Sequence, residues 1–246
     1  HRRAVMALPA LLMPLLASSV AQAQATVSVK GSISGGQWLM NPVWAEAAKD
    51  TSHRYTFRAP SPTVASAAKK LRAYLPKELC IAALQVKGSA KASGKPYQIG
   101  ISGGRTTPVT LVVPSGQNVQ FLNHDPFPHK LYDVGKAANG LGPEETKPAQ
   151  QRIWKPPAVG VYEIRDFFFP SVRSWIVVEP RATAVGFVNT KGEYIIAGLP
   201  EGDYEIQGYF SGKKTGTALK ITVRGAPDMQ PITAPLVVAV KPKKKK

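Results

Sequence analysis

The sequence predicts an all-β protein built as β-sandwich units, with one helix near its N-terminus. Short runs of β-branched and aromatic residues recur from residue 78 onward, separated by Gly, Pro and Asn. The apolar fraction of 43% is enough for buried sheet faces, and 21 Gly with 22 Pro supply many turns. This spacing favours sandwiches, because one face of each sheet must be buried against another.

Residues 1–25 have the features of an export signal. A basic start precedes an apolar run over 4–20, and small residues follow at 21–25. We expect cleavage after Ala23 or Ala25. A membrane anchor is the less favoured alternative, because the run is short and two prolines interrupt it. With no other stretch apolar enough to span a bilayer, we expect export across the inner membrane, to the periplasm or cell surface.

The segment 26–90 is predicted to contain one strand and one helix. Residues 26–35 alternate in polarity, which predicts a strand. Residues 63–75 carry apolar side chains at helical spacing, which predicts a helix that packs on a sheet and ends at Pro76. An amphipathic membrane helix is the alternative interpretation.

From residue 78 onward, across the end of this region, the sequence predicts consecutive short strands. They are expected within 79–90, 97–101, 108–114, 118–123, 129–135, 151–155, 159–166 and 173–180. Cys80 is the only cysteine, so no intramolecular disulfide can form, and its apolar surroundings predict a buried thiol. The polar connection 135–149 is long for a sandwich, which predicts a functional or a mobile loop.

The most informative segment is 119–135, VQFLNHDPFPHKLYDVG. A strand ends at Asn123, a short loop contains Phe127 and Pro128, and His129 follows directly. This arrangement resembles the first histidine region of plastocyanin and related cupredoxins, in which that histidine binds copper. The resemblance implies a cupredoxin-like Greek-key β-sandwich over 91–180.

A second segment, 162–178, resembles the ligand loop of exported bacterial plastocyanin-like proteins, but its ligands differ. Type 1 copper needs two imidazoles, a thiolate and usually a weak thioether. On the family pattern Cys-x-x-His-Pro-x-Met, Asp166 stands at the Cys, Phe169 at the second His and Val172 at the Met. With the longer His-to-Met spacing of plastocyanin, the axial position falls at Ser174 instead. The resemblance therefore implies the fold with a degenerate copper site, and we expect no cofactor.

Two chemistries are open for the altered site. Phe169 would fill the volume of the missing imidazole, and Asp166 would contact His129 in place of the metal. Alternatively His124, Asp125, His129 and Asp166 would form a nitrogen–oxygen site for zinc or copper(II).

No catalytic set emerges from the remaining motifs. The glycine-rich stretch 100–104, GISGG, matches the letters G-x-S-x-G, but no helical pattern follows it, so it is neither a nucleophile elbow nor a phosphate-binding loop. Glu144 and Glu145 lie in a polar loop without a partner that would single them out. We expect a protein without enzymatic activity, with an envelope hydrolase that uses carboxylates as an alternative.

A second unit is predicted over 181–225, with strands within 184–189, 193–198, 203–210 and 218–223. The stretch 192–206 resembles the transthyretin-like, carboxypeptidase regulatory-like β-sandwich. The matching positions are Gly192, Tyr194, Ile196, Gly198, Leu199, Pro200, Gly202, Tyr204 and Ile206. We expect the four alternating aromatic and Ile positions to be buried. Four strands are few for a sandwich, so we expect this unit to dock on the preceding one or to borrow the strand 26–35.

The formal net charge of +17 predicts anionic partners. Residues 226–246 form a Pro- and Lys-rich tail that ends in Lys243, Lys244, Lys245 and Lys246. Strand alternation would place Phe167 and Phe169 inside and Phe168 outside, whereas exposure of Phe167 and Phe168 would mark a partner surface. We expect a binding or structural protein of the cell envelope whose partners are anionic envelope components or other envelope proteins, not nucleic acid.

Overall fold

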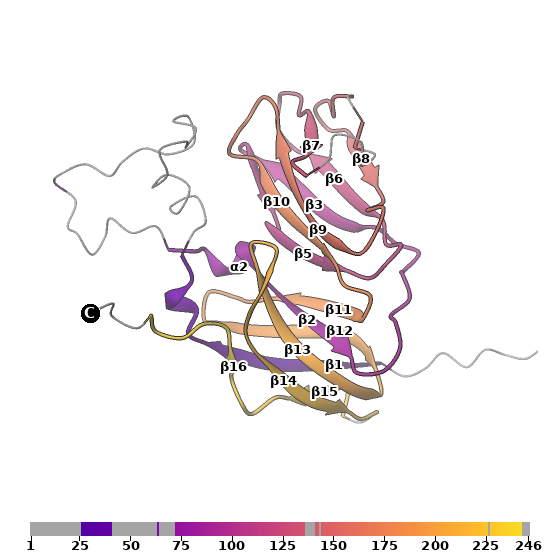
Figure 1. Ribbon diagram of the computed structural model, residues 1–246, viewed down its shortest axis with the longest axis vertical. Coiled ribbons are helices and arrows are strands. Elements are labelled where there is room, and N and C mark those ends of the chain that lie inside the picture. The colour runs from indigo at the N-terminus through magenta and orange to yellow at the C-terminus, as the bar shows by residue number, and fades with distance from the viewer. Residues whose placement is uncertain are drawn as a thin grey trace, which may run out of the picture.

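The computed structural model describes residues 26–40, 63, 72–135, 141–142, 144–225 and 227–242. These residues form two β-sandwiches, one above the other in Figure 1, which confirms the expected all-β class. The upper sandwich comprises β3 to β10, and the lower sandwich comprises β1, β2 and β11 to β16. Within the described residues, no helix has the length and apolar character needed to cross a membrane.

The upper sandwich packs two four-stranded sheets face to face. One sheet has the order β4-β3-β6-β8, formed by β3 (Tyr97–Ser102), β4 (Arg105–Thr107), β6 (Val119–Asn123) and β8 (Gln151–Trp154). The other has the order β5-β10-β9-β7, formed by β5 (Thr110–Val113), β7 (Leu131–Asp133), β9 (Gly160–Asp166) and β10 (Arg173–Val178). Each sheet contains one parallel pair, β3 with β6 and β5 with β10.

The lower sandwich also has two sheets. The first has the order β11-β2-β13-β14, formed by β2 (Leu79–Gln85), β11 (Ala182–Phe187), β13 (Gly202–Phe210) and β14 (Lys213–Val223). In the second, β1 (Thr26–Ser34) lies between β12 (Glu193–Pro200) and β15 (Met229–Pro231), and β16 (Leu236–Val237) also pairs with β1. As expected, Tyr194, Ile196, Tyr204 and Ile206 are buried in this core.

The lower sandwich is built from segments that lie before and after the upper sandwich in the sequence. The expected use of 26–35 is confirmed, because β1 pairs with β12 from Thr26 opposite Pro200 to Ser32 opposite Glu193. The strand with Cys80, β2, also belongs here and is inserted between β11 and β13. The upper sandwich is therefore an insertion between β2 and β11 of the lower one.

The helix expected over 63–75 falls largely outside the described residues, and the described residues 72–74 are not helical. Arg72 forms an isolated β-bridge with Met40, and a short helix, α2 (Leu75–Glu78), begins only afterwards. The prediction that Pro76 ends a helix is wrong. Proline is tolerated in the first turn, where its missing N–H has no intrahelical partner to lose, so here it helps to begin one. A 3₁₀ turn, η1 (Gly36–Trp38), precedes this region.

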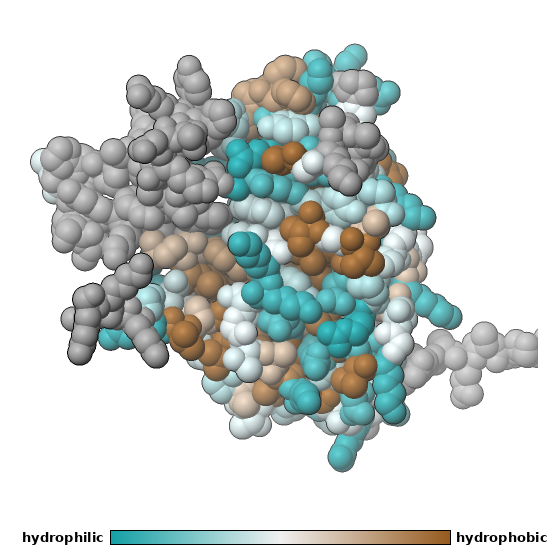
Figure 2. Space-filling model, in the orientation of Figure 1, coloured by the Kyte–Doolittle hydropathy of each residue, from teal (hydrophilic) through white to brown (hydrophobic). Residues whose placement is uncertain are grey.

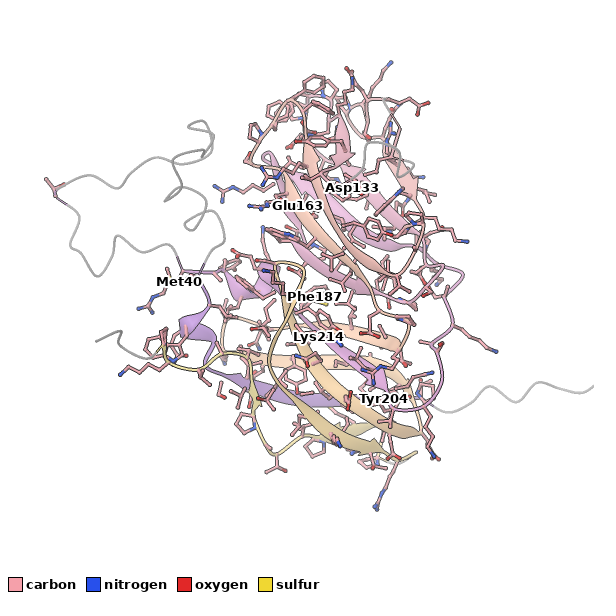
Figure 3. All side chains as sticks on the ribbon, viewed as in Figure 1. Met40, Asp133, Glu163, Phe187, Tyr204 and Lys214 are labelled. Atoms are coloured by element: carbon pink, nitrogen blue, oxygen red, sulfur yellow. The ribbon has the colours of Figure 1, made fainter. Side chains whose placement is uncertain are left out.

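A shared core joins the two sandwiches. Side chains from β2, β5, β10, β11 and β13 form one buried cluster at the junction, and Phe187 packs against it (Figure 3). Cys80 lies in this cluster and is fully buried, as expected. The turn of the β13–β14 hairpin adds a second contact, because the Ser211 N–H donates to Thr110 Oγ1 over 3.1 Å.

Candidate functional site

A polar clamp fixes the loop that follows β6. The Asn123 side chain donates to the carbonyl oxygens of Phe127 and Thr146, each over 2.9 Å, and accepts the Asp125 N–H over 2.8 Å. The backbone of His129 pairs with that of Thr146 in both directions. Part of the long 135–149 connection therefore holds the histidine loop in place.

The His129 imidazole is fully buried between two carboxylates. Its Nδ1 lies 3.0 Å from Asp166 Oδ2, at the end of β9, and its Nε2 lies 3.1 Å from Asp125 Oδ2. The expected contact between Asp166 and His129 is therefore present. An imidazolium has two N–H donors, so the protonated ring satisfies both carboxylates at once.

Backbone N–H groups donate further hydrogen bonds to both carboxylates. Asp166 Oδ1 accepts the N–H groups of Phe168 and Phe169 over 2.6 and 2.9 Å. Asp125 accepts those of Gly103 and Gly104, in the β3–β4 turn, over 2.5 and 2.9 Å. Burial raises the pKa of Asp125, but the bonds from Gly104, Gly103 and His129 outweigh it and hold that pKa below its usual value.

Aromatic side chains enclose the imidazole. The Phe127 and Phe169 rings meet it edge to face, with centroid distances of 5.3 and 5.2 Å, and meet each other at 4.3 Å. Val172 is fully buried in the same core. Phe169 thus occupies the expected volume beside His129.

The expectation that Phe167 points inward is wrong. Phe167 is 62% exposed and Phe168 47% exposed, while Phe169 is partly buried. Side-chain alternation stops at the end of β9, because the Asp166 carboxylate binds two successive amides and turns the chain. Phe167 packs on Tyr132 with a ring centroid distance of 4.3 Å, and the Lys130 ammonium lies 5.5 Å from its ring.

The residues at this site do not fit type 1 copper. Such a centre needs a thiolate, and Cys80 lies in β2 of the lower sandwich. Burial raises the pKa of that thiol to about 12, so it stays protonated at neutral pH. The positions that the sequence resemblance aligns with Cys, His and Met hold a carboxylate, a phenyl ring and a buried Val.

The alternative nitrogen–oxygen set is only partly assembled. Asp125, His129 and Asp166 meet, but His124 is exposed and its ring faces Gly100, where an added Cβ would lie 3.5 Å from His124 Cδ2. Within the described residues, no group of three or more His, Cys, Asp or Glu side chains is arranged to hold a metal ion.

The two adjacent acidic residues of the polar loop lie on the surface. The Glu144 side chain is 83% exposed and lies 3.6 Å from Arg152, and Glu145 is exposed as well. The lysines 243–246 lie outside the described residues.

Comparisons with known proteins concern the fold. The chain matches no protein-family profile and no curated protein. Among solved structures, a purple cupredoxin from Nitrosopumilus maritimus is 22% identical, with a TM-score of 0.31, and the match covers 34% of this chain and 99% of that one. Amicyanin from Paracoccus versutus is 19% identical, with a TM-score of 0.31, over 40% of this chain and 97% of that one. A reduced amicyanin variant is 23% identical, with a TM-score of 0.31, and the match covers 40% of this chain and 99% of that one.

Proposed function

We propose that the protein is an exported, non-catalytic binding protein of the bacterial cell envelope. In this proposal the upper sandwich is a cupredoxin-like domain without type 1 copper ligation, and the lower sandwich is a carboxypeptidase regulatory-like module. The loop end of the upper sandwich would be the binding surface.

The observation that carries this proposal is the occupation of both ring nitrogens of His129. A metal ligand must direct a nitrogen lone pair at a cation about 2.0 Å away. Here a carboxylate oxygen of Asp166 lies at hydrogen-bond distance from Nδ1 and one of Asp125 from Nε2, and the imidazole between them is fully buried. Their arrangement stabilises the loops without a metal and leaves the imidazole no access to a substrate in solution.

The exposed aromatic residues on the same loops support a binding role. Phe167 and Phe168 follow Asp166 directly, so the hydrogen bonds that turn the chain also present these rings to solvent. Figure 2 shows hydrophobic residues at the top of the upper sandwich, where the β9–β10 loop lies in Figure 1. The ammonium of Lys130 beside Phe167 and the net charge of +17 favour an acidic partner.

The metal-free part of the proposal is tested by metal analysis of the purified full chain. After incubation with copper(II) or zinc(II) and gel filtration, we expect far less than one equivalent of bound metal. One equivalent of metal that is lost in the His129→Ala variant would contradict the proposal and favour the alternative metal site.

The binding role is tested by capture from envelope extracts with matched variants. We expect Phe167→Ser combined with Phe168→Ser to abolish recovery of a specific partner. Ile153→Ser is the control, because Ile153 is 57% exposed on β8 of the same sandwich. Equal recovery by both variants would refute the aromatic surface, and unchanged recovery after removal of 241–246 would exclude the lysine tail as an anchor.

A further inference from the structure

Three loops meet at one end of the upper sandwich and form a continuous surface, the loop end. They comprise residues 103–104, 124–130 and 167–172. The Ser171 hydroxyl donates to the Gly104 carbonyl oxygen over 2.7 Å, and the Gly104 N–H donates to Asp125 over 2.9 Å. Because these bonds tie all three loops to one another, the side chains that they expose are held in fixed positions.

The loop end exposes apolar side chains. Phe167 is 62% exposed and Phe168 is 47% exposed, and Pro126 and Pro170 of the same loops are exposed as well. Exposed apolar groups that gather in one place mark a contact with a protein or with a membrane.

The acidic groups of this end are directed inward. Asp125 is the only acidic residue of the three loops, and Asp166 ends β9 just before the third. Both carboxylates are buried and bound to the His129 ring and to backbone N–H groups. The loops themselves therefore expose no carboxylate.

The charges that these loops and their neighbours do expose are basic. The partly exposed Lys130 places its ammonium 5.5 Å from the centroid of the Phe167 ring. Arg105, which begins β4 directly after the 103–104 turn, is exposed. Aromatic rings at the centre with cations beside them complement an anionic surface.

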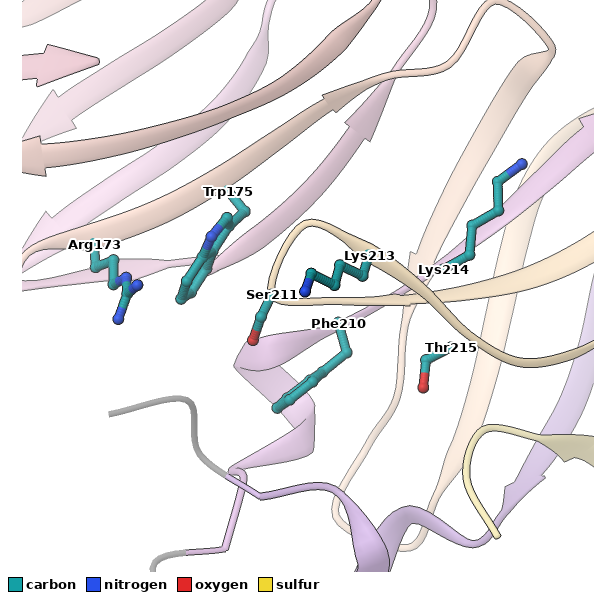
Figure 4. A pocket seen from close by; sticks show the side chains of 7 residues that line it. All are labelled: Arg173, Trp175, Phe210, Ser211, Lys213, Lys214 and Thr215. Atoms are coloured by element: carbon teal, nitrogen blue, oxygen red, sulfur yellow. The ribbon is translucent and has the colours of Figure 1, made fainter. Parts of the chain in front are cut away.

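The lower sandwich covers the other end of the upper sandwich. Figure 4 shows Phe210 and Ser211 of the β13–β14 hairpin near Trp175 of β10, and an added Cβ on Gly212 of this hairpin would lie 2.8 Å from Trp175. The loop end lies at the top of Figure 1, at one extremity of the long axis of the molecule. Its rings can therefore meet a planar surface while the lower sandwich stays away from it.

We propose that the loop end binds an anionic lipid bilayer, with the Phe167 and Phe168 rings inserted at the headgroup boundary. Apolar side chains are accommodated at this boundary, and the ammonium of Lys130 would remain among the lipid phosphates. Charge complementarity selects this partner, because the three loops present cations and no exposed carboxylate. The inference rests on the binding role proposed above for the same loops and names the partner class.

Sedimentation of the full chain with vesicles of phosphatidylcholine, alone or mixed with phosphatidylglycerol, tests this proposal. We expect binding that requires phosphatidylglycerol and that is at least about tenfold weaker for Phe167→Ser combined with Phe168→Ser. Val159→Ser is the matched control and should change binding less than about twofold. Val159 is 61% exposed, as much as Phe167, but it precedes the first residue of β9, about 20 Å away along the strand.

Two lysines of the same sandwich test the contribution of charge. Lys130→Ala should weaken binding to the anionic vesicles about fivefold. Lys155→Ala should change it less than about twofold, because the charge of Lys155 lies farther from the bilayer. Lys155 follows β8, whose Trp154 pairs with Val119 at the start of β6, whereas the 124–130 loop follows the end of β6.

Insertion of the ring is measured separately with Phe167→Trp and vesicles whose acyl chains carry bromine, which quenches tryptophan fluorescence on contact. We expect more quenching than in the native protein, and no such increase for Val159→Trp. The signal reports the position of one ring, so it does not depend on vesicle contacts made by other parts of the chain.

Two results would overturn the inference. Unchanged vesicle binding by the double serine variant, or equal quenching for Phe167→Trp and Val159→Trp, would mean that the rings do not enter the bilayer. If the double serine variant nevertheless lost its partner in the capture from envelope extracts, the binding role would stand with an acidic protein as the partner. If capture were unchanged as well, both proposals would fail.

Discussion

Replacement of Asp166 measures how much of the upper sandwich depends on the buried clamp around His129. The Asp166 side chain is fully buried and accepts three hydrogen bonds, from the His129 ring and the Phe168 and Phe169 amides. Asp166→Ala leaves the His129 Nδ1 position without a partner and Asp125 as the only carboxylate on the ring. Breaking a buried pair by removal of one partner costs about 3–5 kcal/mol. We expect a loss of about 4 kcal/mol in the free energy of unfolding.

The conservative variant separates hydrogen bonding from loss of volume. In Asp166→Asn the new amide oxygen can still accept the two backbone N–H groups, and its NH₂ can donate to Nδ1 of a neutral imidazole. Nε2–H then donates to Asp125, so every polar group keeps a partner. We expect this variant to lose only about 1 kcal/mol.

Urea unfolding at neutral pH, followed by tryptophan fluorescence and circular dichroism, measures both values. The contrast between the two variants is the decisive quantity. If Asp166→Ala lost less than about 1 kcal/mol, or if both variants lost the same amount, the clamp would not stabilise the sandwich as reasoned here.

Two further predictions concern acid and the junction. Because the pKa of Asp125 is lower in the folded protein than in the unfolded chain, its contribution to stability is present above about pH 4 and is lost as the pH falls through the folded pKa. Urea midpoints measured from pH 6 to pH 3 should therefore fall more steeply for the native protein than for Asp125→Asn, and parallel curves would contradict this. Gly212 has φ +76° and an added Cβ would lie 2.7 Å from Val161 and 2.8 Å from Trp175, so Gly212→Ala should cost about 2–3 kcal/mol. A melting temperature equal to that of the native protein would show that the hairpin does not press on the upper sandwich.

Sequence patterns were sufficient to predict the strands and their buried side chains wherever apolar and polar residues alternate along the chain. Most strands were predicted close to their observed positions, and the burial of Tyr194, Ile196, Tyr204 and Ile206 follows from period-two spacing. The contact between His129 and Asp166 followed from the resemblance to cupredoxin ligand loops. The two loops that supply ligands to one metal must lie side by side, so the residues at those positions were expected to meet.

The sequence could not predict features that depend on distant partners. The main role of Asp125 is to bind His129 and the Gly103–Gly104 turn, and nothing near Asp125 in the chain indicates that turn. The outward position of Phe167 depends on where β9 ends, which side-chain hydrogen bonding decides. Short strands such as β4, β15 and β16 have too few residues to show a periodic pattern.

The inserted position of the upper sandwich has a consequence for the order of assembly. Residues 97–178 are contiguous and hold their own core, so this part can fold as soon as it has emerged. The lower sandwich must wait, because β1 acquires its neighbours β15 and β16 only when Met229 and Leu236 arrive. A chain cut short after the upper sandwich would leave the edges of β1 and β2 open to pair with other chains. Completion of the lower sandwich thus requires that synthesis has passed Leu236 and Val237.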